Sequence, residues 1–151
     1  MKLDGTFDTS ASPGTLRSLA ASPAVLAGVP SFREVEVSED GSLRLEYYPV
    51  ISLGPVRFTV TITIGIVTDS SAAIVVRAMR GNNIVEADLL LTFQTADGGS
   101  RVRWEAEVLL GGTAASVGQR VGAEIIARAI GDVLQEAATA ASANAPAGST
   151  I

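Results

Sequence analysis

A chain of 151 residues, of which 47% are hydrophobic and 18% charged, is long enough for one domain with a substantial core. Its net charge of −5 comes without any basic cluster, which argues against nucleic-acid binding, because that requires a concentrated positive surface. The sequence contains no Cys and no His, which excludes thiolate and imidazole groups both from catalysis and from metal binding. We therefore predict no catalytic residue and no metal ligand, and expect that the chain is not an enzyme.

The apolar segments of the sequence are all short. None approaches the ~20 consecutive residues that a transmembrane helix requires, so no membrane span is predicted, and only peripheral contact with a membrane is left open. The mean hydropathy of +0.35 reflects frequent Ala, Val, Ile and Leu rather than a long apolar run. The amino terminus, Met1–Gly5, lacks the apolar core of a signal peptide, and a cytoplasmic location is expected.

The first 30 residues contain one strand pattern followed by two helix-start signals. Alternation of apolar and polar residues predicts a strand over residues 2–9. Ser12-Pro13 and Ser22-Pro23 each place a capping residue before a proline at the first helical position. Two short helices are therefore predicted, ending near Ala20 and Gly28.

From Phe32 to Leu110 the sequence is typical of strands joined by polar turns. The most regular alternation is 56–66, where Val, Phe and Ile share one face and Arg and Thr share the other. Such alternation is typical of an antiparallel sheet with one buried face. The predicted strands cover residues 32–37, 43–48, 56–66, 72–79, 84–95 and 101–110.

The last organised segment, residues 113–138, is predicted to be one long amphipathic helix. The charged residues Arg120, Glu124, Arg128 and Asp132 recur at i, i+4 spacing on one solvated face, and Ile, Val, Leu and Ala occupy the opposite face. In a strand-rich chain this apolar stripe can be buried only against the sheet. The predicted fold class is α+β: a curved antiparallel sheet of about six to seven strands around a long C-terminal helix, with two short helices after the first strand. The domain is expected to span residues 1–140, followed by a disordered tail over 141–151.

Three local motifs and one strand carry a family resemblance. They are Gly111–Arg120 (GGTAASVGQR) before the last helix, Leu26–Pro30 (LAGVP), Leu53–Phe58 (LGPVRF) and Arg101–Val108 (RVRWEAEV). With these motifs, the chain resembles the family of carbon monoxide dehydrogenase G subunits, which belongs to the START-like (SRPBCC, polyketide cyclase/lipid transport) helix-grip superfamily. The resemblance covers roughly residues 1–138.

The resemblance implies a small accessory protein of a molybdenum hydroxylase system, with a cavity suited to a hydrophobic ligand. The implied ligand is quinone-like or lipid-like, with menaquinone as the candidate, and no covalently bound cofactor is expected. The implied partners are the dehydrogenase itself or its assembly ATPase. Two alternatives stay open: a structural adaptor or maturation factor without a ligand, and a cyclase or hydratase acting through carboxylates or Tyr47.

Gln119 is the sharpest candidate for ligand recognition, because it is a polar residue on the apolar face of the predicted helix. Its amide could hydrogen-bond a carbonyl or hydroxyl of the ligand, or it could bond nearby backbone instead. Gly118 and Gly122 flank it, and each lowers helix propensity by about 1 kcal/mol relative to Ala, which suggests a packing or cavity reason.

The remaining predicted ligand-binding residues are apolar and could equally be ordinary core. Besides Gln119 and Gly122, they are Ala123, Ile126, Phe58, Ile62, Trp104 and Val29. The loop at residues 28–31 is a candidate gate to the cavity or a plain connection. Glu86 and Asp88 share one strand face and could form an acid pair, but a solvated sheet face explains them better.

Overall fold

The computed structural model describes residues 1–21, 23–48, 57–112 and 119–143. Side chains are described for these residues except at positions 20–25, 119–125 and 142–143. In chain order the elements are β1 (Lys2–Thr9), α1 (Pro13–Ala21), the 3-10 helix η1 (Pro23–Gly28), β2 (Phe32–Val37), β3 (Leu43–Tyr47), β4 (Phe58–Val67), β5 (Ser71–Arg80), β6 (Asn83–Ala96), β7 (Gly99–Gly111) and α2 (Gln119–Ala143).

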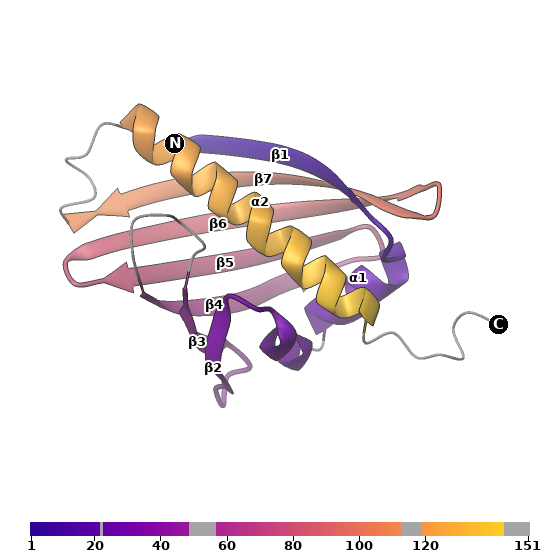
Figure 1. The fold of residues 1–151 in the computed structure, drawn as a ribbon, viewed down its shortest axis with the longest axis horizontal. Helices are drawn as coiled ribbons and strands as arrows, with labels where there is room; N and C mark the ends of the chain where they lie inside the picture. Colours follow the sequence, from indigo (N-terminus) through magenta and orange to yellow (C-terminus); the bar gives the residue numbers. More distant parts are fainter. Residues whose placement is uncertain (22, 49–56, 113–118, 144–151) are drawn as a thin grey trace.

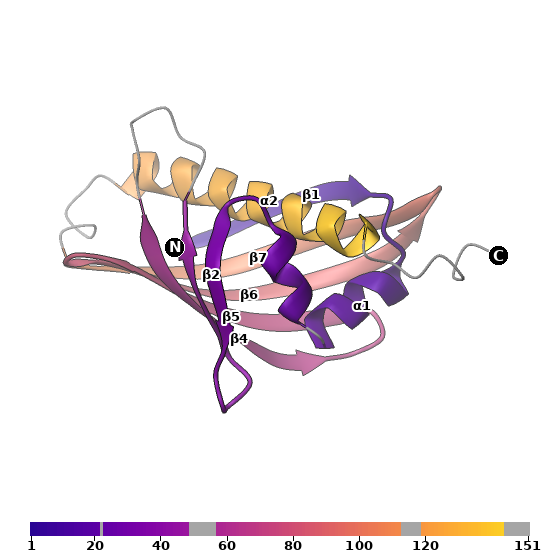
Figure 2. The ribbon, with the colours of Figure 1, turned by 60° about the horizontal axis from the view of Figure 1, so that its bottom comes forward.

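The strands form one antiparallel sheet in the order β1-β7-β6-β5-β4-β3-β2. Figure 1 shows α2 lying across one face of this sheet. Figure 2 shows the sheet curling, so that β1 at one edge and β2 and β3 at the other rise on either side of the helix. The predicted α+β class, the curved sheet around a long C-terminal helix and the two short helices after the first strand are confirmed.

The two faces of the sheet differ in character because side chains alternate along each strand. On β7, Val102, Trp104, Ala106 and Val108 are buried, while the intervening Arg and Glu residues are exposed. The register places apolar residues of β6 and β7 opposite one another on this face, as with Leu91 and Trp104. The face toward α2 is therefore a continuous apolar surface.

Irregular pairing bends the sheet at two places. The register between β4 and β5 shifts between Ile64 and Val67. In β2 the shift falls between Arg33 and Glu36, and Glu34 adopts a positive φ of 53°. An extra residue in one strand kinks it and increases its local twist, which suits the end of the sheet that curls around the helix.

Helix α2 buries its apolar face against the sheet and the short helices. Ile126, Ile130, Val133 and Leu134 pack against the core clusters, whereas Arg128 is exposed. The helix continues to Ala143, later than the expected end near Ala138, because the alanines of its last turns are also buried, among them Ala138, Ala140 and Ala141. Small side chains allow this end of α2 to approach its neighbours closely. The predicted start at residues 113–118 and the tail from residue 144 lie outside the described residues.

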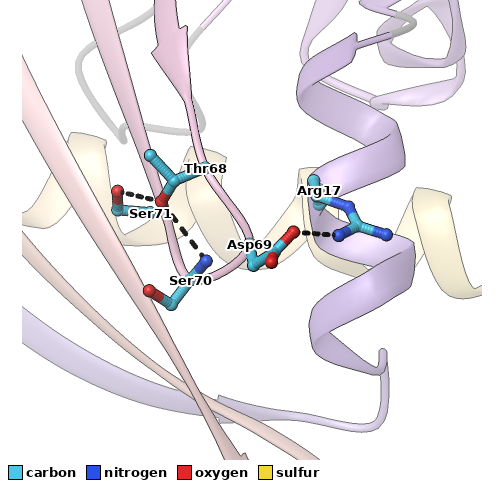
Figure 3. A network of polar contacts seen from close by, with 5 residues as sticks. All are labelled: Arg17, Thr68, Asp69, Ser70 and Ser71. Carbon is cyan, nitrogen blue, oxygen red and sulfur yellow. Dashed lines mark hydrogen bonds and ion pairs between the residues drawn. The ribbon is translucent and has the colours of Figure 1, made fainter.

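Polar contacts hold α1 beside the turn between β4 and β5. Arg17 of α1 forms an ion pair with Asp69, with 2.6 Å between Nη1 and Oδ1. Figure 3 shows this pair next to the turn, where the hydroxyls of Thr68 and Ser71 lie 2.7 Å apart. Asp69 is almost fully exposed and Arg17 about half exposed, so the pair stabilises the fold by no more than about 1 kcal/mol. The pair links α1 to this turn but adds little to the stability of the fold.

Candidate ligand-binding site

A cavity of about 280 Å³ lies between the inner face of the sheet and α2. Every strand of the sheet contributes to its walls, and α1 adds Leu16 and Leu19 at one end. Apart from Tyr47, every residue described as lining it is Ala, Val, Leu, Ile or Phe. Apart from Tyr47, the described walls offer water no hydrogen-bond partners. The cavity is therefore suited to the apolar part of a small molecule.

Three of the predicted ligand-binding residues line this cavity. Phe58 and Ile62 approach it from β4, and Ile126 approaches it from α2. Gln119, Gly122 and Ala123 fall within α2, but their side chains are outside the described part of the structure. Their roles in ligand binding stay predictions.

Trp104 is buried on the same face of the sheet but does not line the cavity. Only 3% of its surface is exposed, and it lies opposite Gly5 of the edge strand β1. A Cβ atom at Gly5 would lie 2.5 Å from the indole Nε1, so the ring occupies the space that any other residue at this position would need. The indole ring therefore packs against β1, the edge strand of the sheet.

Val29 is also buried, with 1% of its surface exposed, in the core beneath β2 and β3. It shares a cluster with Leu26 and Phe32, and its carbonyl accepts a hydrogen bond of 3.0 Å from the N–H of Phe32. The predicted gate at residues 28–31 does border a hollow, because Gly28, Pro30 and Ser31 line a second pocket. Val29 itself anchors the loop in the core instead of facing that pocket.

The second pocket, which we call the cleft, has a volume of about 540 Å³. It lies between the loop after η1 and the second half of α2, and its lining includes Asp132, Gln135, Glu136 and Thr139. Ser31 bridges its two walls, because its hydroxyl donates a hydrogen bond of 2.7 Å to Oε2 of Glu136. Among the residues described as lining the cleft, two are acidic and none is basic. The cleft is therefore more polar than the cavity and carries negative charge.

Tyr47 and Val133 line both the cavity and the cleft, so the two spaces adjoin at these residues. The Tyr47 ring contacts Phe32 edge-on at 6.1 Å between centroids and lies 6.4 Å from the Phe58 ring, so aromatic neighbours on both sides fix its position. Burial, reinforced by the negative charges of Glu136 and Asp132, raises the pKa of Tyr47 to about 12. The hydroxyl is therefore protonated at neutral pH and can donate a hydrogen bond.

The acidic residues of the cleft were not predicted as site residues, since the charge pattern assigns Asp132 only to the solvated stripe of the helix. A signal for Glu136 was present, because it lies three residues after Val133 and four before Ala140, both of which face the core. An acidic residue at that spacing sits at the border of an apolar stripe. The sequence indicates Tyr47 only as a residue of the cyclase alternative, although its place at the end of an alternating strand puts it on the inner face.

Other predicted features of the polar surface find simple explanations. Glu86 lies on the outer face of the sheet and pairs with Arg77, with 3.4 Å between Oε1 and Nε. Asp88 is exposed beside it, so the two carboxylates belong to a solvated face. Within the described ranges, no group of three acidic residues is arranged to hold a metal ion. None of the described helices combines the length and apolarity needed to cross a bilayer.

Comparison with known proteins bears on both the fold and the family. The family model described as the carbon monoxide dehydrogenase G subunit (CoxG) matches residues 5–142, which confirms the resemblance predicted from the motifs. No curated protein sequence matches the chain.

Solved structures with the same fold are numerous but distant in sequence. A conserved protein from Geobacillus kaustophilus superposes with a TM-score of 0.76 at 13% identity, covering 95% of this chain and 96% of that one. A protein from Thermus thermophilus gives 0.63 at 14% identity, covering 97% and 100%. The di-domain ARO/CYC BexL from the BE-7585A biosynthetic pathway gives 0.64 at 15% identity, covering 97% of this chain and 50% of that one. These similarities support the START-like helix-grip fold.

Proposed function

The chain belongs to the CoxG family of carbon monoxide dehydrogenase G subunits, and we propose that it is a non-enzymatic accessory protein that binds a hydrophobic ligand for a molybdenum-containing dehydrogenase. The ligand would be quinone-like or lipid-like, with menaquinone as the candidate. The partner would be the dehydrogenase or its assembly ATPase, in the cytoplasm or at the membrane surface.

The observation that carries this proposal is the apolar cavity between the sheet and α2. Protein interiors are packed as densely as organic crystals, and voids larger than a water molecule are few. An unfilled apolar space of about 280 Å³ forfeits the contacts of all the side chains around it. A ligand that filled it would recover those contacts and bury apolar surface at ~25 cal/mol per Å². Retention of such a space is most simply explained by an occupant.

This proposal can be tested by introducing a larger side chain into the wall of the cavity. Ala78 lines it from β5, and its neighbour Met79 points to the opposite, solvated face. Ala78→Phe should therefore reduce the affinity for menadione, a soluble naphthoquinone, by about tenfold, which is ~1.4 kcal/mol. Met79→Phe is the matched control and should leave binding unchanged. Quenching of the single tryptophan, Trp104, together with calorimetry, measures the affinity.

The result that contradicts the proposal is equally definite. If the wild-type protein binds neither menadione nor simple alkyl probes, and organic extraction of the purified protein yields no lipid or quinone, the cavity is not a carrier site. The adaptor alternative would then be favoured. Circular dichroism of both variants establishes that a loss of binding does not come from unfolding.

A further inference from the structure

The cleft beside the cavity suggests what kind of ligand the protein accepts. We propose that the polar head of the ligand lies in the cleft at Tyr47, and that the cleft selects heads that donate hydrogen bonds or carry positive charge. The ligand class is then an amphiphile with a hydroxyl or ammonium head and an apolar remainder in the cavity; among quinone-like ligands this means the reduced quinol, whose hydroxyls donate, and not the quinone, whose carbonyls only accept. This inference rests on the proposed function and adds an orientation and a selectivity to it.

The orientation follows from how the two spaces adjoin. The described walls of the cavity are apolar except at Tyr47, so they offer a polar head no other partner, and a buried head without partners is strongly disfavoured. The cleft adjoins it at Tyr47 and Val133 and carries hydroxyls, carboxylates and an amide. Among the described residues, a molecule that spans both spaces finds partners for its apolar part in the cavity and for its polar head in the cleft.

The selectivity follows from the hydrogen-bonding capacity of the cleft. Glu136 accepts one bond from Ser31 through Oε2, and its second carboxylate oxygen has no partner among the described residues. Within the same described ranges, Asp132 forms an ion pair only with Arg128, at 4.0 Å and on an exposed surface. Ionised carboxylates are acceptors only, so they favour a ligand that donates.

Tyr47 adds one donor at the junction. Its hydroxyl makes no hydrogen bond to another residue in the described part of the chain, and it retains its proton at neutral pH. A hydroxyl head can accept from Tyr47 and donate to Glu136 at the same time, and an ammonium head can donate to both acidic residues. A carboxylate or phosphate head can accept from Tyr47, but an ionised carboxylate has no proton to donate to Glu136, and either head would approach two like charges.

Three probes with the same tail and different heads test this inference: decylamine, 1-decanol and decanoate. Calorimetric titration at neutral pH, below the concentration at which each probe aggregates, should give the tightest binding for decylamine and the weakest for decanoate. We expect a ratio of about tenfold or more between these two affinities, which is ~1.4 kcal/mol.

Charge-neutralising variants locate the source of the preference. Glu136→Gln should reduce the decylamine-to-decanoate ratio to about threefold or less, and the double variant with Asp132→Asn should abolish it. Glu107→Gln is the matched control, because it changes the net charge equally on the exposed outer face of β7. The control should keep the wild-type ratio.

Each contrary outcome identifies which statement fails. If all three probes bind equally, or decanoate binds best, the selectivity is wrong while ligand binding in the cavity stands. If the ratio survives in the double variant, or falls equally in Glu107→Gln, the preference comes from overall charge and the inference is wrong. If no probe and no quinone binds, the proposed function itself fails.

Discussion

The cavity and the cleft adjoin each other, yet only the cleft carries charged side chains among its described lining residues. The cavity is walled by apolar side chains from the strands of the sheet and from the helices, and Tyr47 supplies its one described polar side chain. The cleft lies between one loop and one face of α2, and it combines two carboxylates with hydroxyl and amide groups. The same helix, α2, contributes to both spaces, with Ile126 and Ile130 in the first and Asp132 and Glu136 in the second.

The contrast shows how one fold separates affinity from selectivity. Apolar burial is non-directional and roughly proportional to area, so the cavity can bind many shapes of apolar molecule. Hydrogen bonds and charges are directional, so the cleft can distinguish heads that differ in one group. Substitutions in the two spaces should therefore have different consequences, for the fold in one case and for ligand choice in the other.

The largest expected loss of stability comes from a substitution in the cavity wall. Phe93 lines the cavity from β6 and is 6% exposed, so Phe93→Ala should lower the free energy of unfolding by about 3–5 kcal/mol. Gln135→Ala, in the cleft and exposed, should change it by less than ~0.5 kcal/mol. Urea denaturation measures both. Equal losses of stability would mean that the cleft is as much a part of the core as the cavity is.

A smaller loss of stability is expected at the edge of the sheet, where Gly5 contacts Trp104. Gly5→Ala places a Cβ atom against the Trp104 indole and should destabilise the protein by roughly 1–3 kcal/mol. Because Trp104 lies outside the cavity, menadione affinity should change little in this variant, while the tryptophan emission should shift. A large loss of menadione affinity in a variant that remains folded would place the indole in the binding site after all.

The fold and part of the cavity could be predicted from the sequence for a physical reason. Period-two alternation in the strands fixes which residues face the helix, so Phe58 and Ile62 could be placed on the inner face without knowing the topology. Burial alone does not separate a cavity wall from packed core. Trp104 shows this, because its exclusion from the cavity depends on Gly5, near the start of the chain, which becomes its neighbour only through the β1–β7 register.

The cleft was harder to predict, because it depends on contacts between distant segments. Ser31 and Glu136 are 105 residues apart, and neither belongs to a motif that points to the other. The sequence pattern places the polar recognition group at Gln119, at the start of α2, whereas the cleft borders the second half of that helix. A polar residue inside an apolar stripe is visible in a sequence, but one at the border of a stripe is not distinguished from ordinary surface.

The smallest expected effect concerns Tyr47, where the two spaces meet. Its pKa is raised from 10.0 to about 12, chiefly by burial and then by the charges of Glu136 and Asp132. Absorbance of the tyrosinate should therefore show one of the two tyrosines ionising near pH 12, and Tyr47→Phe should remove that step. Glu136→Gln should lower the pKa only in part, since burial is the larger cause.

The same shift predicts how stability depends on pH. The unfolded chain releases the Tyr47 proton near pH 10, whereas the folded chain keeps it until about pH 12. Between these values the folded state binds more protons, so this contribution to stability is complete below pH 10 and is lost as the pH rises to 12. Urea denaturation across this window should show a steeper decline for the wild type than for Tyr47→Phe. Parallel declines would mean that the ring is open to solvent, and the cleft would then be a surface depression instead of a continuation of the cavity.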